Sequence, residues 1–377
     1  MPWREVSIMS ERQEFVMLAS QEGANKRELC RRFEVSAPTG YKWLARYREG
    51  GGTALQEGSR RPHHSPARTA TEIERAILAL REEHPAWGAR TLHRRLEMLG
   101  QGPLPAPSTI QAILARHGRI DPAQSAKHRP WQRFEHAAPN DFWQMDFKGH
   151  FALAQGRCHP LTVLDDHSRY SVCLQACANE TGDTVQGKLT AVFRRYGLPA
   201  RIGMDNGAPW GDSPEHPFTP ITVWLIHLGI GVVHSRPYHP QTLGKDERFH
   251  RTLKRELLSR TPLLDLGSAQ RHFDAWRYTY NFERPHQALD RAAPATRYRP
   301  SARAFPEALP TIEYAPDCAI RKVDQNGRIS FHGRPLRVGP AFYGYPVALR
   351  PTVEDGVWEV YFCHQKIKCI DLRELNS

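Results

Sequence analysis

The chain has 377 residues, of which 40% are hydrophobic and 24% charged, a balance that is typical of a folded globular protein and excludes a disordered or fibrous one. This length favours two to four domains over a single core. No apolar run is long enough to span a bilayer, and residues 1–15 lack the apolar core of a signal peptide, so we expect a cytosolic protein. The seven cysteines are odd in number and form no C-x-x-C pair, which predicts reduced thiols and argues against a disulfide framework or a thiolate zinc site.

The net charge is +12 and is unevenly distributed. Residues 1–139 hold 22 Lys and Arg against 15 Asp and Glu, whereas residues 301–377 hold 10 against 9. Positive charge gathered at one end is typical of a module that binds a polyanion, because each neutralised phosphate releases condensed counterions. A basic surface that is merely solvated is the alternative at this point.

Residues 12–48 have the pattern of three short helices. The second begins at a capping box, Asn25-Lys26-Arg27-Glu28, and the third begins after a cap at Ser36. A helix, a tight turn and a basic second helix form the helix-turn-helix pattern, which binds DNA; a plain helical hairpin is the alternative. On the third helix the expected buried face is Tyr41, Leu44 and Ala45. The candidate DNA-binding residues are Thr39, Lys42 and Arg46.

A second helical unit starts at Thr71, where Thr71-Glu72-Ile73-Glu74 predicts another capping box, and it continues through two further helices to His117. Gly50-Gly51-Gly52 and the basic stretch 59–64 separate the two units and have the composition of a flexible linker. Within that linker, we expect Arg60 and Arg61 to lie along a DNA backbone. Two small DNA-binding units in tandem are therefore expected, followed by a second linker.

Residues 140–300 mix predicted strands and helices. The strands are predicted at 142–148, 159–164, 169–176, 200–204 and 230–234. The helices are predicted at 181–196, 219–228, 243–259 and 268–283. Beyond residue 300 the chain turns into short strands, and Asn326-Gly327 predicts a hairpin between 321–325 and 328–331. A second pair, 347–351 and 358–362, flanks Asp355-Gly356, so residues 312–375 are expected to form a small antiparallel barrel.

Three acids stand where the local pattern gives a carboxylate no ordinary role. Asp146 lies in the middle of a predicted strand, where Asp is unfavourable. Asp205 ends another strand and precedes Asn206-Gly207, which turns the chain at the carboxyl edge of the sheet. Glu247 lies in the first turns of the helix 243–259. Taken singly, each acid has a structural alternative: a polar residue on an edge strand, an Asx turn and a helix-dipole partner, respectively.

The helix around Glu247 is two-faced. Phe249, Leu253 and Leu257 form an apolar stripe. The opposite face carries Glu247, Arg251, Lys254 and Arg255 at i, i+4, i+7 and i+8. An acid beside a row of bases suits a metal ligand next to a phosphate backbone.

Phosphodiester hydrolysis explains why acids alone suffice. The reaction needs an activated water and charge stabilisation on the attacking and leaving oxygens, and two Mg²⁺ ions about 3.5–4 Å apart supply both. Mg²⁺ takes a few carboxylates together with water and phosphate oxygens, so a site of three acids needs no His or Cys. We therefore expect two Mg²⁺ ions as cofactors, for which Mn²⁺ can substitute.

Three sequence blocks carry a family resemblance. Trp143-Gln144-Met145-Asp146, Met204-Asp205-Asn206-Gly207 and residues 238–248 resemble the signature blocks of the retroviral-integrase-type catalytic core, which many bacterial insertion-sequence transposases share. Residues 280–289 and 294–298 resemble the end of that core in the bacterial branch. The resemblance implies a ribonuclease H-like fold in which Asp146, Asp205 and Glu247 are the acidic, metal-holding triad. It also implies that Lys254 contacts donor DNA, and that hydrolysis at the element's ends precedes attack of the freed 3′-hydroxyl on target DNA.

Two features depart from the family pattern. The His and Cys zinc head of retroviral integrases is absent from the sequence, and the helical units take its place. In addition, 41 residues separate Asp205 from Glu247, which is longer than usual and predicts an insert at 210–218. The long gap leaves Asp246 as an alternative third ligand, although the block Gly244-Lys245-x-Glu-Arg favours Glu247.

The chain is accordingly interpreted as a multidomain DNA transposase that binds the terminal inverted repeats of a mobile element. Its expected segments are a helix-turn-helix domain (1–58), a second helical, winged-helix or helix-turn-helix-like domain (59–118), a linker (119–139), an α/β ribonuclease H-like core (140–300) and a β-barrel (301–377). The expected partners are double-stranded DNA and further copies of the chain, as a dimer or larger assembly on DNA. The alternatives are a DNA-binding regulator with an inactive core and a ribonuclease H-like nuclease without strand transfer.

Six further positions near the acids are expected to have structural roles. The pair Asp165 and Asp166 is interpreted as a turn. His234, His239 and His250 are interpreted as solvated, although they lie close enough in sequence to the acids to contact DNA. Trp210 is expected to pack locally and not to stack on an unpaired base.

Overall fold

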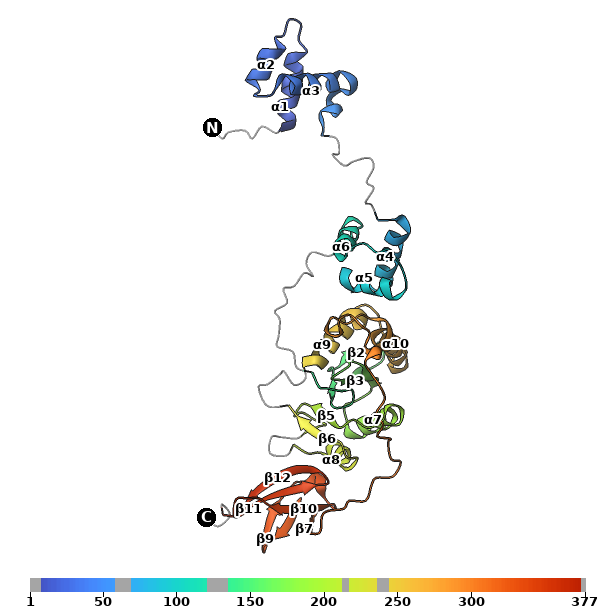
Figure 1. Cartoon of the computed structure of the whole chain (residues 1–377), viewed down its shortest axis with the longest axis vertical. Helices are drawn as coiled ribbons and strands as arrows, with labels where there is room; N and C mark the ends of the chain where they lie inside the picture. Colours follow the sequence, from blue (N-terminus) through green and yellow to red (C-terminus); the bar gives the residue numbers. More distant parts are fainter. Residues whose placement is uncertain (1–7, 58–68, 121–134, 212–216, 236–243, 374–377) are drawn as a thin grey trace. The chain divides into compact units, whose positions relative to one another are not determined.

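The computed structural model describes residues 8–57, 69–120, 135–211, 217–235 and 244–373. The chain divides into two compact units, Met1–Arg68 and Thr69–Ser377. Figure 1 shows the elements along the chain, coloured from the N-terminus to the C-terminus. Within the described ranges, the search for a helix of the length and apolarity needed to cross a membrane found none.

The first unit consists of three helices, α1 (Ile8–Ala19), α2 (Lys26–Arg32) and α3 (Ala37–Gly50), followed by a short 3-10 turn. The predicted caps are confirmed. The Asn25 side chain accepts a hydrogen bond from the backbone N of Glu28, and Ser36 Oγ accepts one from the backbone N of Thr39. These bonds satisfy donors that have no partner inside a helix, which is why α2 and α3 begin at these residues.

The buried face of α3 differs from the prediction. Tyr41 is 46% exposed and Ala45 is exposed, whereas Gly40 and Leu44 are buried. A Cβ on Gly40 would lie 2.5 Å from the Sγ atom of Cys30, so the helix approaches α2 through the one residue without a side chain. Close packing at a glycine rotates the helix relative to the pattern that apolar residues alone suggest.

The second unit begins with three further helices, α4 (Thr71–Glu83), α5 (Ala89–Met98) and α6 (Pro107–Arg116), and their shared core contains buried Ile, Leu and Trp side chains. The capping box predicted at Thr71 is wrong. Thr71 is already helical, and the cap position, Ala70, offers no side-chain acceptor. Glu74 instead lies 2.6 Å from both Arg116 Nη2 and His117 Nε2, so its carboxylate ties α4 to the end of α6.

A mixed sheet follows. Its strands are β1 (Trp143–Phe147), β2 (Phe151–Ala152), β3 (Arg157–Asp165), β4 (Ser171–Cys177), β5 (Arg201–Met204) and β6 (Gly231–His234). Strand β3 pairs antiparallel with β1, β2 and β4, whereas β1, β5 and β6 run parallel to one another. The predicted strands are thus confirmed, and the two-residue strand β2 is the addition.

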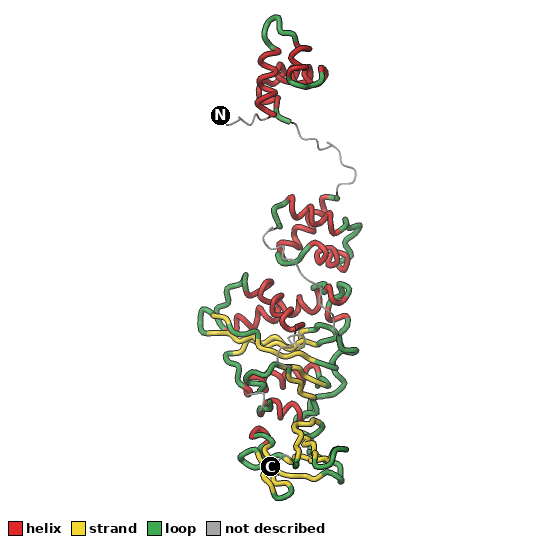
Figure 2. The backbone as a smooth tube through the Cα atoms, turned by 90° about the vertical axis from the view of Figure 1, so that its left-hand side faces the viewer, coloured by secondary structure: helices red, strands yellow, loops and turns green. Residues whose placement is uncertain are grey.

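Helices cover both faces of this sheet (Figure 2). On one face, α7 (Gly182–Tyr196) and α8 (Pro220–His227) share an apolar core with β1 and β5. On the other face, α9 (Gly244–Leu253) and α10 (Leu266–Tyr278) pack on the opposite side of β3 and β4. The helices predicted at 243–259 and 268–283 each end in a π-helical turn, Lys254–Leu258 and Thr279–Glu283.

The C-terminal strands are antiparallel, as predicted. Strands β7 (Ala319–Lys322), β10 (Pro346–Pro351), β11 (Val357–Phe362) and β12 (Gln365–Asp371) form a four-stranded sheet in the order β12-β11-β10-β7, and β8 (Arg328–Phe331) pairs with β9 (Arg334–Arg337). Closure into a barrel stays a prediction. Gln365 connects this sheet to the core, since its side chain accepts from the backbone N and donates to the backbone O of Val232 in edge strand β6.

The hairpin predicted at Asn326-Gly327 is wrong, although the turn itself forms. Gly327 has a φ of +70°, and the Asp324 side chain accepts hydrogen bonds from the backbone N atoms of Asn326 and Arg328. The chain before the turn is already paired elsewhere, because Val323 exchanges backbone hydrogen bonds with the segment at Tyr345. The turn therefore joins strands of different sheets, and β8 finds its partner in β9.

Candidate metal-binding active site

Asp146 and Asp205 lie at the same edge of the sheet. Strands β1 and β5 are parallel neighbours in which Trp143 is opposite Ile202 and Gln144 is opposite Gly203. Continuing this register by two residues brings Asp146 opposite Asp205. The carboxyl ends of parallel strands meet at one edge, so two acids far apart in sequence become neighbours.

The environment of Asp146 disfavours its charged form. Burial and the negative charges of Asp205, Glu180 and Glu247 raise its pKa to about 7, against a weaker opposing effect from a backbone hydrogen bond. The Asp146 side chain still keeps 27% of its surface exposed. An accessible carboxylate crowded by other acids is the arrangement that a divalent cation stabilises.

Glu247 projects from the first turn of α9. It is exposed, whereas the apolar stripe Phe249, Leu253 and Leu257 is buried against the sheet as predicted. Its charge contributes to the raised pKa of Asp146. Asp205 lies at that edge as well, and its Oδ1 accepts a hydrogen bond from the backbone N of Gly207, as in an Asx turn.

Asp246, the alternative third acid, lies inside the protein. It is fully buried, and its carboxyl oxygens lie 3.1 and 3.3 Å from Thr162 Oγ1. His250, one helical turn further on, lies 2.7 Å from the same hydroxyl. Burial and the nearby charge of Asp146 raise the pKa of Asp246 well above its ordinary value, while burial and Lys148 lower the pKa of His250 to about 3. His250 is therefore uncharged at neutral pH, and its surroundings disfavour the charged form of Asp246.

Two sets of side chains offer ligand atoms for a metal. In the described residues, one atom each of Asp146, Asp246 and His250 lies within 4.8 Å of the others. In this set Asp246 is fully buried, and both Asp246 and His250 contact Thr162, whereas Mg²⁺ keeps several waters and needs open space around it. The second set, Asp146, Asp205 and Glu247, supplies only oxygens, and its binding of Mg²⁺ stays a prediction.

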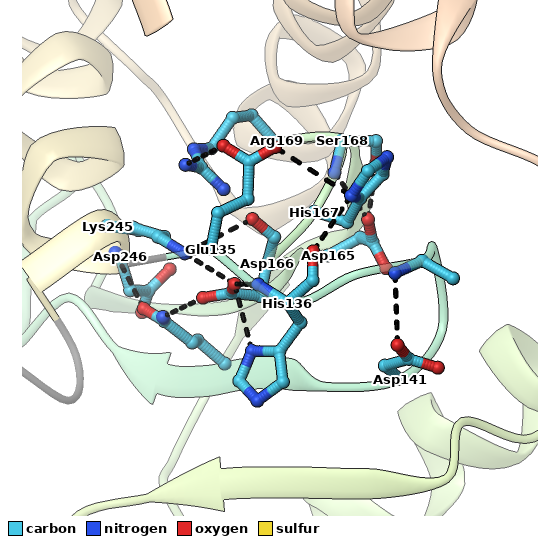
Figure 3. A network of polar contacts seen from close by, with 12 residues as sticks. Glu135, His136, Asp141, Asp165, Asp166, His167, Ser168, Arg169, Lys245 and Asp246 are labelled. Atoms are coloured by element: carbon cyan, nitrogen blue, oxygen red, sulfur yellow. Dashed lines mark hydrogen bonds and ion pairs between the residues drawn. The ribbon is translucent and has the colours of Figure 1, made fainter. Parts of the chain in front are cut away.

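The turn between β3 and β4 is structural, as predicted for Asp165 and Asp166 (Figure 3). Asp165 is buried and accepts hydrogen bonds from the backbone N and Oγ of Ser168 and the backbone N of Asn140. Asp166 is also buried, and its carboxylate accepts from Gln144, His136 and Lys245. Burial would raise the pKa of Asp166, but the hydrogen bonds from Lys245 and His136 outweigh it and hold this pKa below its ordinary value.

The bases predicted to contact DNA on the α9 segment are all exposed. Arg251 lies on α9 itself, and Lys254 and Arg255 lie on the π-helical turn that follows. Exposure leaves these three side chains accessible to a phosphate backbone beside Glu247. Their contact with DNA stays a prediction.

The candidates in the first unit differ from one another. Lys42 is exposed, whereas Arg46 is half-buried with its guanidinium 5.1 Å from the ring centre of Trp43. The Thr39 hydroxyl is 2.8 Å from Ser36 Oγ and so completes the helix cap. Of the three, Lys42 is the most accessible to DNA. Arg60 and Arg61 lie outside the described residues.

The remaining predictions near the site have different outcomes. Trp210 is 1% exposed and stacks on Phe147 at 5.8 Å, so its local packing is confirmed. The prediction that His250 is solvated is wrong, because α9 turns it toward Thr162 inside the protein. His234 is half-buried and its Nδ1 lies 3.0 Å from the backbone O of Asp205; His239 lies outside the described residues.

Sequence reasoning missed the polar cluster behind Asp146. Gln144 lies between apolar residues in the sequence of β1, and it is 2% exposed because α9 covers it. Thr162 was assigned no role, although its hydroxyl donates to the backbone O of Asp146 at 2.9 Å. The i, i+4 spacing of Asp246 and His250 was the available signal, since it places both on one helix face.

Family models match the chain in several segments. Models of an integrase core domain match residues 136–240 and 228–294, and a model of the C-terminal domain of IS481 family transposases matches residues 318–377. A helix-turn-helix domain model matches residues 11–63, and a homeodomain-like domain model matches residues 39–114. The helical DNA-binding type of the N-terminal region and the integrase type of the central core are thereby confirmed.

Curated relatives come from insertion elements. The chain is 30% identical over 171 residues to the insertion element IS407 uncharacterized 31.7 kDa protein of Burkholderia multivorans, which covers 44% of this chain and 59% of that protein. It is 31% identical over 159 residues to the insertion element IS476 uncharacterized 39.2 kDa protein of Xanthomonas euvesicatoria, covering 42% and 44%. The chain thus spans about half the length of these relatives. A solved simian T-cell lymphotropic virus intasome is 18% identical, with 78% of this chain and 99% of that chain covered, at a TM-score of 0.38.

Proposed function

Because this chain is a relative of bacterial insertion-sequence transposases with an integrase-type core, we propose that it is a metal-dependent DNA transposase. In this proposal it binds the terminal inverted repeats of a mobile element and hydrolyses phosphodiester bonds at the element's ends. It then joins the 3′-hydroxyl ends to target DNA. The protein acts on chromosomal DNA in the cytoplasm, as a dimer or larger assembly, because two ends must react together.

The observation that carries the proposal is the register of β1 and β5, which brings Asp146 opposite Asp205 at one edge of the sheet. Asp146 lies near the end of β1, Asp205 directly follows β5, and Glu247 projects from the helix that covers β1. Burial and the surrounding negative charges raise the pKa of Asp146 to about 7. An acidic edge of this kind has no structural use to the fold itself, and it supports a site for divalent cations.

Each acid has a defined part in the proposed reaction. When bound, two Mg²⁺ ions supply an activated water and stabilise the attacking and leaving oxygens. Asp146 supplies a carboxylate oxygen from the centre of the edge, Asp205 supplies one from the neighbouring strand, and Glu247 supplies one from α9. The buried His250 and Thr162 exclude water behind Asp146 and orient its strand.

The basic residues bind the DNA substrate in this proposal. Arg251, Lys254 and Arg255 neutralise phosphates beside the acidic edge. In the helix-turn-helix domain, Lys42 is the main residue that contacts DNA. Arg60 and Arg61 extend these contacts along the backbone. The five segments expected from the sequence, with boundaries at 58, 118, 139 and 300, are the proposed division between end recognition and chemistry.

One experiment tests the activity. The full chain is incubated with Mg²⁺, a duplex carrying the terminal repeat that brackets its gene, and a supercoiled target plasmid. Joined products support the transposase. Cleavage without joining would indicate a nuclease of the same fold, and a mobility shift without cleavage would indicate a DNA-binding regulator.

A further inference from the structure

Three residues of the sequence blocks that the acidic set does not use meet behind the site. Gln144 precedes Asp146 on β1, Asp166 lies in the turn after β3, and Lys245 lies in the first turn of α9. Gln144 Nε2 donates to Asp166 Oδ1 at 2.8 Å, and Lys245 Nζ forms an ion pair with Asp166 Oδ2. Figure 3 shows Lys245 and His136 converging on the Asp166 carboxylate from different segments.

Both ends of the Gln144 amide are engaged. Its Oε1 accepts a hydrogen bond from the backbone N of Asp246 at 3.2 Å, while its Nε2 donates to Asp166. The Asp246 N–H belongs to the first turn of α9, where backbone donors lack partners inside the helix. Gln144 therefore closes a chain of contacts from the β3–β4 turn through β1 to the start of α9. With a donor and an acceptor both satisfied and only 2% of the residue exposed, the side chain has one orientation.

We propose that Gln144, Asp166 and Lys245 are positioning residues that lock the first turn of α9, and with it Glu247, onto the strand that carries Asp146. This inference rests on the proposed metal site. The three residues do not contact the reacting atoms. They fix the distance between acids that come from a helix and from a sheet, and they act beside the contacts that Asp246 and His250 of α9 make with Thr162 of β3.

The choice of residue types favours positioning over plain stabilisation. A buried ion pair adds little to stability compared with well-packed apolar side chains of similar volume. Apolar contacts at this junction would, however, allow α9 to slide or rotate, since they have no preferred direction. Directional hydrogen bonds at 2.8 and 3.2 Å define one arrangement of the helix on the strand.

The test measures Mn²⁺ binding to the full chain without DNA, by electron paramagnetic resonance. In Gln144→Glu, the new carboxylate still accepts from Asp246 but faces the Asp166 carboxylate without a donor. We expect Mn²⁺ affinity to fall about tenfold to a hundredfold, the usual effect of losing a residue that orients a ligand. In the double variant Gln144→Glu/Asp166→Asn, the new amide at position 166 donates to the new carboxylate at position 144. The hydrogen bond is thus restored with donor and acceptor exchanged. Its affinity is expected within about threefold of the wild-type value, since the two sites are directly coupled.

Gln270 provides a matched control. It also joins a helix to a strand, because its side chain accepts from the backbone N of Ala176 and donates to the backbone O of Leu174. Helix α10 carries none of the proposed ligands. Gln270→Glu is therefore expected to lower thermal stability while leaving Mn²⁺ affinity unchanged.

The outcomes separate the inference from the proposed function. If wild-type protein fails to bind Mn²⁺, or if Asp205→Asn binds it equally well, the metal site itself is wrong. If Asp205→Asn loses binding but folded Gln144→Glu keeps wild-type affinity, the positioning role is overturned. A double variant as weak as the single one also overturns it. Should Gln144→Glu fail to fold, Gln144→Met removes both hydrogen bonds without adding charge and is held to the same criterion.

Discussion

Asp146 and Asp166 are both connected to β1, Asp146 as a residue of the strand and Asp166 through a hydrogen bond from Gln144, yet their surroundings are opposite. Other acids crowd Asp146, and together with burial they raise its pKa to about 7. Lys245 and His136 surround Asp166 and hold its pKa below the ordinary value in spite of its burial. The charge of Asp166 is neutralised by cationic side chains of the protein itself, so this carboxylate is part of the fold. Asp146 lies among other acids, so its charged form needs a cation from outside the chain.

The largest expected effect comes from removing the carboxylate charge of Asp146. Asp146→Asn should lower DNA cleavage and joining at least about a thousandfold, equivalent to about 4 kcal/mol, because the substituted amide is a poor metal ligand. The same change should leave the unfolding temperature of the metal-free protein equal or higher, since it removes repulsion among the acids. Joining assays and calorimetry on one preparation check both parts. Undiminished joining would sink the assignment of Asp146.

Asp166 should behave in the reverse way. Asp166→Ala removes the acceptor shared by Gln144, His136 and Lys245, and breaking such a buried pair costs about 3 kcal/mol in the free energy of unfolding. Urea unfolding followed by tryptophan fluorescence measures the loss. Asp355, an exposed turn residue, is the matched control, and Asp355→Ala should change the value by less than about 0.5 kcal/mol. If Asp166→Ala lowered the free energy of unfolding no more than Asp355→Ala does, the contacts of Asp166 would not stabilise the fold as proposed.

Divalent metal should stabilise the protein only by binding at the edge of the sheet that carries Asp146 and Asp205. Mg²⁺ at about a hundred times its dissociation constant is expected to add about 2.7 kcal/mol, because it binds the folded state selectively. Thermal unfolding with and without Mg²⁺ measures this gain. Asp205→Asn should lose it, while Asp355→Ala should retain it. A gain that survives in Asp205→Asn would place the metal elsewhere.

The position of Asp205 at the carboxyl edge of the sheet could be predicted from the sequence, because a strand pattern precedes it and Asn206-Gly207 turns the chain after it. The helix caps at Asn25 and Ser36 were equally predictable, since they depend on residues three positions away. Short-range hydrogen bonds and strand periodicity depend only on residues that are close together in the sequence, so both can be predicted from it.

Contacts between distant segments were not predictable in the same way. The burial of Gln144 depends on the covering helix, which lies 102 residues further on and donates to its side chain. The Asn326-Gly327 turn forms as expected, yet Val323 before it pairs with another segment, because its backbone N donates to Tyr345 O and its backbone O accepts from Gly344 N. Local chemistry specifies turns and caps, whereas the identity of a partner depends on which segments the whole fold brings together.

The smallest expected effect, about 1 kcal/mol per pH unit, is also the most direct contrast between the two carboxylates. Asp146 has a folded-state pKa above its unfolded value, so its contribution to stability is present at acidic pH and is lost as pH rises through about 7. Asp166 has a lowered pKa, so its contribution is present above its ordinary pKa and is lost as pH falls through the folded value. In metal-free protein, Asp146→Asn should flatten the decline between pH 5 and about 7, and Asp166→Asn should flatten the decline at acidic pH. Urea titrations across this range measure both slopes. If the two variants altered the profile with the same sign, the charges around these carboxylates would not be the cause of their difference.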